Sequence, residues 1–274
     1  MVVVEALGSA FRTGILARMT RTALPQTCAL DLAQLWLRLG HAVYLGPSLG
    51  LAAHSTAIAS LGVGIDAPFR VRTVGAPDIT ARSFLFRPRV VHHVVHSEGR
   101  MLFCFFDPTS TRVQRALGAM TRTVDGFAIA HSDEGELIDL CSGPEIDVER
   151  LLDLASMPVP DIRDPRIAAI AAAIRAEPEL PQRASERAAA AGLSTSYFLR
   201  TFAAQTGTSF RRYVQWARML RVAKEFAAGH DLTRAAVDSG FASPSHFSDT
   251  FRSMFGLTPS AFTTVGSDLH IMDR

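Results

Sequence analysis

Two stretches near the C-terminus repeat one another: SYFLRTFAAQTG at residues 196–207 and SHFSDTFRSMFG at residues 245–256. A serine, two phenylalanines, a threonine and a glycine recur in the same order, each 49 positions apart. Each copy follows a helix-forming stretch, a glycine and a short turn that ends in serine. This order predicts a helix, a tight turn and a second helix, which is the arrangement of a helix-turn-helix unit.

Serine residues mark the predicted starts of the repeated helices. Ser194 precedes the first, and Ser243, followed by a proline at the first helical position, precedes the second. Between them, Ser209 begins a long helix over residues 210–228, and Thr233 begins a short one. The long helix spans roughly 28 Å, so with its flanking turns it would hold the two repeated helices about one turn of DNA, ~34 Å, apart.

Each repeated helix has an apolar face and a polar face. Phe198 and Phe202 in the first copy, like Phe247 and Phe251 in the second, are four residues apart and are predicted to face the core. The opposite faces carry Ser196, Leu199, Arg200 and Ala203 in the first copy, and Ser245, Ser248, Asp249 and Arg252 in the second. Small polar groups and forked guanidiniums on the second helix of such a unit suit the major groove of DNA.

Over residues 165–262 the chain resembles the DNA-binding domain of the AraC/XylS family of bacterial transcription regulators. The stretches AAGLSTSYFLRTFAAQTGTSFRRYVQWARML and LTRAAVDSGFASPSHFSDTFRSMFGLTPSAF carry the resemblance, in order and in spacing. The resemblance implies double-stranded promoter or operator DNA as a partner, and RNA polymerase as a second. It also implies DNA contacts from Ser194, Thr195, Ser196, Leu199, Arg200, Ser243, Ser245, His246, Ser248, Asp249 and Arg252.

Asp249 departs from the family pattern, which often has arginine at this position. Either Arg252, three residues further on, pairs with the carboxylate, or the carboxylate accepts a hydrogen bond from a cytosine amine. The alternative is that the second unit contacts mainly the DNA backbone and contributes little to sequence reading.

The segment from residue 30 to residue 107 has a different pattern. HAVYLG, STAIASLGVGI, FRVRTV, SFLFRP and RMLFCFF each predict a strand bounded by turn residues. Strands this close together, without helices between them, favour an antiparallel barrel or sandwich. Residues 109–156 are predicted to be helical, and three prolines in residues 157–166 indicate a linker.

Together these patterns predict an α+β protein of two domains. By family resemblance, the front domain is a cupin-like antiparallel β-barrel with trailing helices. The back domain is all-α, with two helix-turn-helix units joined by a long helix. The expected layout is a partly disordered N-terminal extension, an effector-sensing and dimerisation domain, a linker, the DNA-binding domain and a polar tail, at residues 1–29, 30–157, 158–165, 166–262 and 263–274.

A cluster of arginines in the front domain suggests where an effector binds. Arg70 and Arg72 leave the same face of FRVRTV, and Arg82, Arg87 and Arg89 follow one hairpin away. If they face the barrel interior or a dimer groove, they form a site for an acidic sugar, an aromatic acid or a cyclic dinucleotide. If they face solvent, they are an ordinary polar sheet face.

Two histidines resemble parts of the cupin metal-site motifs. His54 belongs to the first, and His92, after Pro88, belongs to the second. The ligand set is incomplete, because Thr56 stands where a second histidine is needed and no suitably placed glutamate follows. Both histidines are therefore assigned to the core or to the effector pocket, and no metal, cofactor or catalytic residue is expected.

Charge and cysteine content fit this division. Residues 165–274 carry 13 basic and 9 acidic side chains, whereas residues 1–164 carry 15 and 17, so only the back part is suited to a polyanion. Cys28, Cys104 and Cys141 form no CxxC pair and indicate buried thiols in a reducing compartment. A signal peptide and an apolar run of ~18 residues are both lacking, so the predicted location is the cytoplasm, away from the membrane.

The sequence therefore predicts a DNA-binding transcription regulator of the AraC type whose DNA affinity changes when a small effector binds the front domain. The leucine-bearing helices at residues 134–157 predict a homodimer. Two alternatives stay open: a regulator whose front domain only dimerises, and, less favoured, a cupin-type metal enzyme that carries a DNA module. Activation and repression both stay open as outcomes.

Overall fold

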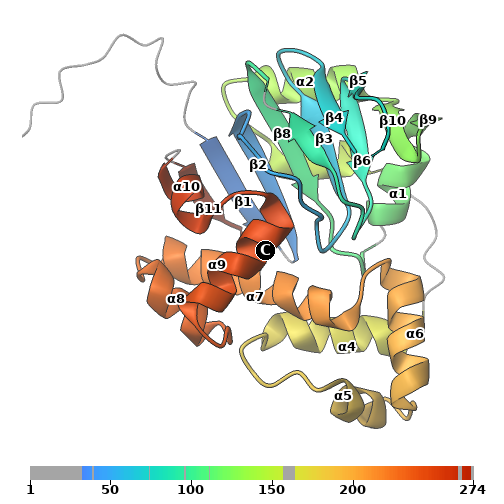
Figure 1. Cartoon of the computed structure of the whole chain (residues 1–274), viewed down its shortest axis with the longest axis vertical. Helices are drawn as coiled ribbons and strands as arrows, with labels where there is room; N and C mark the ends of the chain where they lie inside the picture. The colour runs from blue at the N-terminus through green and yellow to red at the C-terminus, as the bar shows by residue number, and fades with distance from the viewer. Residues whose placement is uncertain are drawn as a thin grey trace, which may run out of the picture. The chain divides into compact units, whose positions relative to one another are not determined.

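The computed structural model describes residues 33–38, 40–73, 75–95, 97–110, 112–156, 164–264 and 267–272 (Figure 1). The strands are β1 (Ala33–Arg38), β2 (His41–Pro47), β3 (Ser60–Gly64), β4 (Phe69–Arg72), β5 (Ile79–Ala81), β6 (Ser83–Phe86), β7 (His93–Val95), β8 (Arg100–Phe105), β9 (Met120–Val124), β10 (Phe127–His131) and β11 (Ser267–Ile271). The helices are α1 (Arg112–Gly118), α2 (Glu134–Ser142), α3 (Val148–Leu154), α4 (Pro165–Ala176), α5 (Ala184–Ala190), α6 (Thr195–Thr206), α7 (Phe210–Ala227), α8 (Leu232–Asp238), α9 (Pro244–Phe255) and α10 (Pro259–Thr264).

The front part of the chain is built on two sheets. Eight strands form one sheet in the order β11-β1-β2-β8-β3-β6-β10-β9, and three strands form the other in the order β5-β4-β7. Neighbouring strands are antiparallel except β11, which runs parallel to β1. The larger sheet ends in two different strands, β11 and β9, so it is an open cupin-like sheet and not a closed barrel. The α+β fold class is confirmed, with this one correction.

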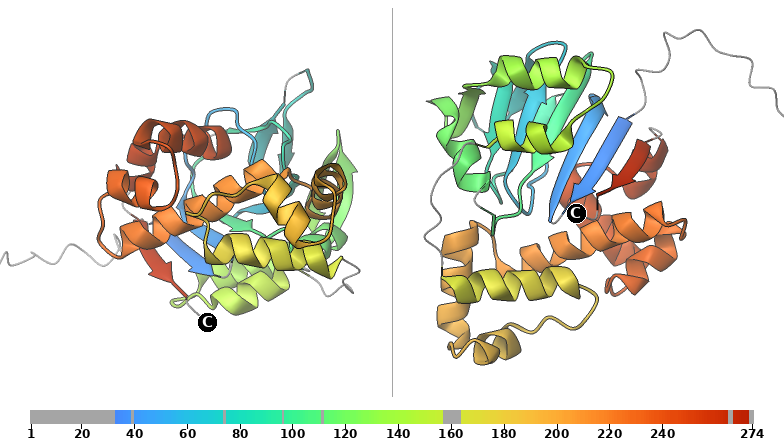
Figure 2. Two further views of the ribbon diagram at one scale, coloured as in Figure 1. Left: turned by 90° about the horizontal axis from the view of Figure 1, so that it is seen from below. Right: turned by 180° about the vertical axis from the view of Figure 1, so that it is seen from behind.

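Helices α2 and α3 cover one face of the larger sheet, as the right-hand view of Figure 2 shows. Leu137, Cys141 and Leu151 are buried in one cluster with Val43 and Leu102 of the sheet. The leucines that predicted a dimer contact are therefore core residues in this chain, and the dimer itself stays a prediction. Cys104 and Cys141 are buried free thiols, as expected, while Cys28 lies outside the described residues.

The helical region begins with α4 and packs against the front part of the chain. Leu37 and Ile58 of the front part share one apolar cluster with Trp216 and Met219 of α7 and Phe247 of α9. By contacts between residues, the sheets and the helical region belong to one compact unit. The core of the protein is thus continuous from the sheets into α7 and α9.

Most predicted helix starts agree with the structure. The side chains of Ser194, Ser209 and Ser243 each accept a hydrogen bond from the backbone N–H three residues on, which caps α6, α7 and α9. The predicted start of α8 is wrong. Asp231, not Thr233, caps it, because the Asp231 carboxylate accepts from the backbone N–H of Arg234 at 3.0 Å.

Two further segments differ from the expectation. Residues 120–131 form the hairpin β9–β10 within a region predicted to be helical. Asp125 and Gly126 at its turn both have positive φ, 46° and 82°, which is the backbone of a tight hairpin turn. The segment expected to be a polar tail contributes β11 to the sheet, with Ala33 opposite Ser267 in the register.

The expected N-terminal extension, residues 1–29, and residues 157–163 of the expected linker lie outside the described residues. In the part of the chain that the structure describes, no helix combines the length and apolarity needed to cross a membrane.

Candidate nucleic-acid interface and effector cavity

The two repeated helices, α6 and α9, present the predicted DNA-contacting residues at the surface. In α6 and its cap, Ser194, Thr195, Ser196, Leu199 and Arg200 are all exposed. Tyr197, which the sequence reasoning passed over, is 42% exposed, and the Arg200 guanidinium lies 5.9 Å from the centre of its ring. The sequence signal for Tyr197 was its place in the first turn of a helix predicted to contact DNA. The arginine and the ring form one flat, cationic surface suited to a base edge or a phosphate.

The outer face of α9 carries Ser245, Asp249 and Arg252, which are exposed, and Ser243, His246 and Ser248, which are partly exposed. His246 is turned back toward the preceding turn, where its Nδ1 accepts from the backbone N–H of Ala242 at 3.4 Å. Among the ion pairs of the described residues, none joins Asp249 to Arg252. The pairing considered from the sequence is therefore not formed, and both side chains are exposed.

The inward faces of the two helices rest on different supports. Phe198 and Phe202 of α6 are completely buried and pack edge-to-face against Phe210 and Tyr213 of α7. In α9, Phe247 is buried, but Phe251 at the position equivalent to Phe202 is only partly buried. The first unit thus has a closed apolar core, whereas part of the inner face of the second is open.

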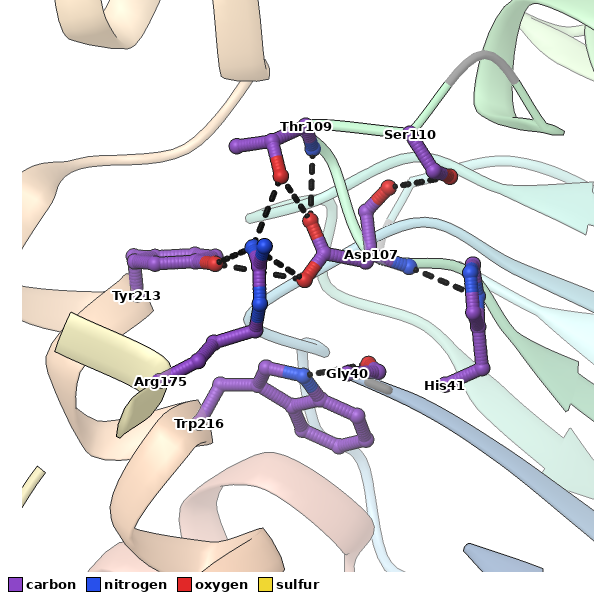
Figure 3. Close-up of polar contacts among 8 residues, drawn as sticks. All are labelled: Gly40, His41, Asp107, Thr109, Ser110, Arg175, Tyr213 and Trp216. Carbon is purple, nitrogen blue, oxygen red and sulfur yellow. Dashed lines mark hydrogen bonds and ion pairs between the residues drawn. The ribbon is translucent and has the colours of Figure 1, made fainter. Parts of the chain in front are cut away.

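A buried polar cluster joins the front sheet to α4 and α7 (Figure 3). Nη1 of Arg175 donates to Asp107 Oδ2 at 2.9 Å, to Thr109 Oγ1 at 2.8 Å and to Tyr213 Oη at 2.7 Å. The Tyr213 hydroxyl in turn donates to Asp107 Oδ2 at 3.2 Å, and burial raises the pKa of this phenol. Asp107 is 1% exposed, so its charge is held by partners alone. We call this group, Asp107, Thr109, Arg175 and Tyr213, the polar anchor.

His41 completes the polar anchor on the sheet side. Its Nδ1 accepts from the backbone N–H of Asp107 at 3.1 Å, which requires this nitrogen to be unprotonated. Burial lowers the pKa of His41 to about 4, against the opposing effect of the Asp107 charge. Sequence reasoning missed the polar anchor because its members lie far apart in the chain and form no local motif.

The second unit is attached to the front part by backbone contacts at the end of α9. Gly256 O accepts from the backbone N–H of Ala52 at 2.7 Å, and Ser253 O accepts from that of Ser55 at 3.3 Å. From α7, Nη2 of Arg212 donates to Thr56 O at 3.2 Å and to both oxygens of Ser55. The loop at residues 51–56 is thus held between α7 and α9.

A cavity of about 150 Å³ lies behind this loop, between the front sheet and the helical region. Its wall is mainly apolar and comes from β1, β2, β3, β6, β8, α7, α8, α9, α10 and the loops between them. It includes Leu35, Tyr44, Phe86, Phe103, Phe105, Trp216, Met219, Phe247, Phe251, Phe255 and Phe262. The open part of the inner face of α9 is therefore the wall of this cavity. We call the cavity the effector cavity, after the role proposed for it below.

His54 and His92, two residues predicted for the effector pocket, lie together at the wall of the effector cavity. Their backbones form an isolated antiparallel bridge, and their ring centres are 4.6 Å apart. Burial lowers the pKa of His92 to about 3 and also lowers that of His54. Among the described residues, no three His, Cys, Asp or Glu side chains lie together as a metal site would require.

The predicted arginines do not line the effector cavity. Arg70 and Arg72 are exposed, while Phe69 and Val71 between them are buried. Arg72 makes a two-pronged ion pair with Asp78, from Nε at 2.9 Å and from Nη2 at 3.0 Å. Of the two alternatives, the solvent-facing sheet surface is the one observed.

The remaining predicted arginines are also outside the effector cavity. Arg87 and Arg89 are exposed. Arg82 lines a separate polar groove with Arg122, in which Asp78, Asp125 and Glu134 outnumber the two guanidiniums. A groove with more carboxylates than guanidiniums is a poor site for an anion.

Comparison with known proteins agrees with this architecture. Residues 187–264 match a family model described as a helix-turn-helix domain. No curated protein matches the chain in sequence. Among solved structures, ToxT from Vibrio cholerae is similar, at 13% identity and a TM-score of 0.54, over 82% of this chain and 97% of that chain.

Two further ToxT structures agree in extent. An apo variant is 14% identical, with a TM-score of 0.56 over 84% of this chain and 98% of that chain. The wild-type protein with an unsaturated fatty acid bound is 14% identical, with a TM-score of 0.55 over 82% and 94%. The helix-turn-helix match spans both α6 and α9, and the fold over most of the chain is similar to that of ToxT, which agrees with the resemblance of the sequence to the AraC/XylS family.

Proposed function

We propose that this chain is a DNA-binding transcription regulator that inserts α6 and α9 into the major grooves of promoter DNA. Its affinity for DNA changes when a small effector occupies the effector cavity. One observation carries the proposal: α9 exposes Ser245, Asp249 and Arg252 on its outer face and forms part of the cavity wall on its inner face. A molecule in the cavity thus contacts the helix that reads DNA, which couples the two binding events.

The chemistry of the cavity favours a mainly apolar effector over the acidic sugar or cyclic dinucleotide considered from the arginine pattern. The arginines lie on other surfaces, and the cavity wall is built mainly from phenylalanine, leucine and methionine side chains. A bound unsaturated fatty acid in ToxT supports the proposal that this fold accommodates apolar small molecules. A homodimer, contact with RNA polymerase, the absence of catalysis and a cytoplasmic location stay predictions from the sequence.

The test is a selection of duplexes from a random DNA pool with the full chain, followed by binding measurements on the selected site. We expect Arg200→Ala combined with Arg252→Ala to reduce affinity by about 100-fold, because each forked contact contributes roughly 1–3 kcal/mol. Arg150→Ala is the matched control: this arginine is exposed on α3 and pairs with Glu136, away from both reading helices.

Two outcomes would count against the proposal. If the double variant binds the selected site like the wild type, the reading helices do not contact DNA. If Arg150→Ala weakens binding as much as the double variant does, the loss reflects net charge alone. The dependence of affinity on salt, measured for all three chains, separates base contacts from phosphate contacts, because only phosphate contacts contribute to the slope.

A further inference from the structure

The effector cavity has a polar corner in a mainly apolar wall, to which Ser60 and Thr263 also contribute. His54, His92 and Thr56 line it and are 7%, 2% and 4% exposed. The hydroxyl of Thr56 is buried and has no hydrogen-bond partner among the described residues. A buried polar group without a partner is costly unless a ligand or water satisfies it, so this corner is where a polar group of a ligand is needed.

The protons on the two histidine rings can be assigned from their neighbours. Nδ1 of His54 lies 2.9 Å from Ala52 O, and Nδ1 of His92 lies 2.9 Å from Val90 O. A carbonyl oxygen only accepts, so each Nδ1 carries the hydrogen. Both rings are neutral at pH 7, because burial lowers both pKa values. Each Nε2 is therefore a hydrogen-bond acceptor, and no described protein group donates to it.

Charge is missing from the wall of the effector cavity. No Arg, Lys, Asp or Glu side chain is among the described residues that line it. Arg212 is a nearby cation, but it is not part of the wall. Its Nη2 donates to the backbone oxygens of Ser55 and Thr56, while its Nε is buried without a hydrogen-bond partner among the described residues. An anion in this cavity would lose its water and face two imidazole lone pairs without a cation to compensate.

The size of the cavity sets the size of the ligand. The apolar space of about 150 Å³ in this cavity fits a molecule the size of benzene. Phe86, Phe103 and Phe251 supply aromatic faces and edges around it.

We propose that the effector cavity binds a small, neutral, ring-sized molecule with one O–H or N–H donor, such as a phenol, which donates to Nε2 of His54 or His92. This inference rests on the proposed function, in which the same cavity is the effector site. It defines the ligand by three properties: a ring-sized apolar body, no charge, and a donor at one end.

The test compares three probes of similar size on the full chain: phenol, toluene and benzoate. Phenol carries the donor, toluene lacks it, and benzoate carries a charged acceptor in its place. Binding is measured by titration calorimetry and by the rise of the unfolding midpoint with ligand concentration. We expect phenol to bind about tenfold more tightly than toluene, as one hydrogen bond to a buried acceptor implies, and benzoate to bind most weakly.

His92→Phe sharpens the test. His92 stacks on Phe86 with ring centres 4.1 Å apart, so a phenyl ring keeps the shape and removes the acceptor. We expect the tenfold preference for phenol over toluene to fall in this variant. Tyr44→Phe is the matched control: Tyr44 also lines the cavity, but its hydroxyl donates to Pro47 O at 2.8 Å, so the preference should stay unchanged.

Each outcome decides between the inference and the function on which it rests. Equal binding of phenol and toluene, or tighter binding of benzoate, overturns the donor requirement while leaving the cavity as a binding site. Failure of all three probes to bind overturns both the ligand class and the cavity as an effector site. DNA binding is then judged separately by the Arg200 and Arg252 variants. The comparison of probes on the wild type stands even if His92→Phe does not fold.

Discussion

The two reading helices have the same sequence pattern but different attachments to the front part of the chain. The unit of α6 rests on a closed core, and α4 and α7 are joined to the sheet by the polar anchor. The unit of α9 is attached by backbone hydrogen bonds to the loop at residues 51–56 and by the wall of the effector cavity. The first attachment is made by specific polar contacts, and the second by an apolar cluster that borders a cavity.

Under the proposed function, this difference indicates which half of the DNA-binding domain would respond to an effector. A buried ion pair with hydroxyl partners fixes one geometry, because each displacement leaves a charge or a donor unsatisfied. An apolar cavity tolerates several arrangements of its wall, and a ligand that fills it favours one of them. We therefore expect the first unit to be the fixed element and the second unit to be the adjustable one.

The largest expected effect comes from breaking the polar anchor. Asp107→Asn removes the charge that faces Arg175 and Tyr213 in a buried site, and we expect the free energy of unfolding to fall by about 3 kcal/mol. Urea unfolding at pH 7.5 measures this loss. Asp78→Asn is the control, since its ion pair with Arg72 is exposed and should leave stability unchanged within error. If Asp107→Asn lowers the free energy of unfolding no more than Asp78→Asn does, the polar anchor does not hold the first unit.

The second prediction compares two equivalent glycines at the ends of α6 and α9. Gly207 and Gly256 have φ of 68° and 76°, so alanine at either position costs about 1 kcal/mol in backbone strain. A Cβ on Gly207 has only Pro88 nearby, at 3.8 Å, whereas a Cβ on Gly256 would lie 2.5 Å from Ala52 O. We expect Gly256→Ala to destabilise the chain by about 2 kcal/mol more than Gly207→Ala.

Urea unfolding of both glycine variants gives the comparison, and ligand titration of Gly256→Ala extends it. The clash lies beside His54, so this variant should also lose affinity for the cavity probes while Gly207→Ala keeps it. Equal destabilisation by the two substitutions would contradict the close contact between α9 and the loop at residues 51–56.

The repeated helices could be predicted from the sequence because their signals are local. A serine cap, a pair of phenylalanines four residues apart and a terminal glycine all act within one or two turns. The hairpin at residues 120–131 also had a local signal, the Asp125–Gly126 pair, which the helical periodicity of the surrounding region obscured. Thr233 and Asp231 are both good caps, and only the position of the first helical hydrogen bond decides between them.

The attachments could not be predicted in the same way. Apart from the local bond between Thr109 and Asp107, the polar anchor joins residues 38 to 106 positions apart. Nothing in the neighbourhood of Asp107 or Arg175 identifies the partner. For Arg70 and Arg72 the alternation predicted that both share a face, which is correct, but not which face is buried. The pairing of β4 with its neighbouring strands determines the exposed face, on which Asp78 lies beside Arg70 and Arg72.

The third prediction concerns pH, because neutral buried histidines lie at both attachments: His41 at the polar anchor, and His54 and His92 at the effector cavity. Burial lowers the pKa of His41, at the polar anchor, to about 4 and that of His92, at the effector cavity, to about 3, from 6.5. Between its pKa in the folded chain and 6.5, each histidine binds a proton in the unfolded chain but not in the folded chain. Stability therefore falls as the pH drops below 6.5. Each ring should contribute about 1.4 kcal/mol to the loss between pH 7.5 and pH 5.5.

Urea unfolding at the two pH values measures this loss for the wild type, His41→Gln and His92→Gln. Glutamine does not titrate, so each substitution should remove the share of one ring from the pH dependence, whatever its effect on stability at pH 7.5. If both variants lose as much unfolding free energy between pH 7.5 and pH 5.5 as the wild type does, neither histidine is kept neutral by burial in the folded chain.

The smallest expected effect is also the most specific test of the comparison. On the selected DNA site, Arg200→Ala and Arg252→Ala should each reduce affinity by about tenfold, measured by fluorescence anisotropy. Adding a saturating cavity ligand such as phenol should leave the factor for Arg200→Ala unchanged, because α6 lies on the fixed unit. The factor for Arg252→Ala should change by a few-fold, because α9 moves with the cavity wall and its contact with DNA is made in only one of the two arrangements. If the ligand changes the loss of DNA affinity by the same factor in both variants, or in neither, the two units do not respond differently to the cavity. The effector cavity would then not act on α9 alone.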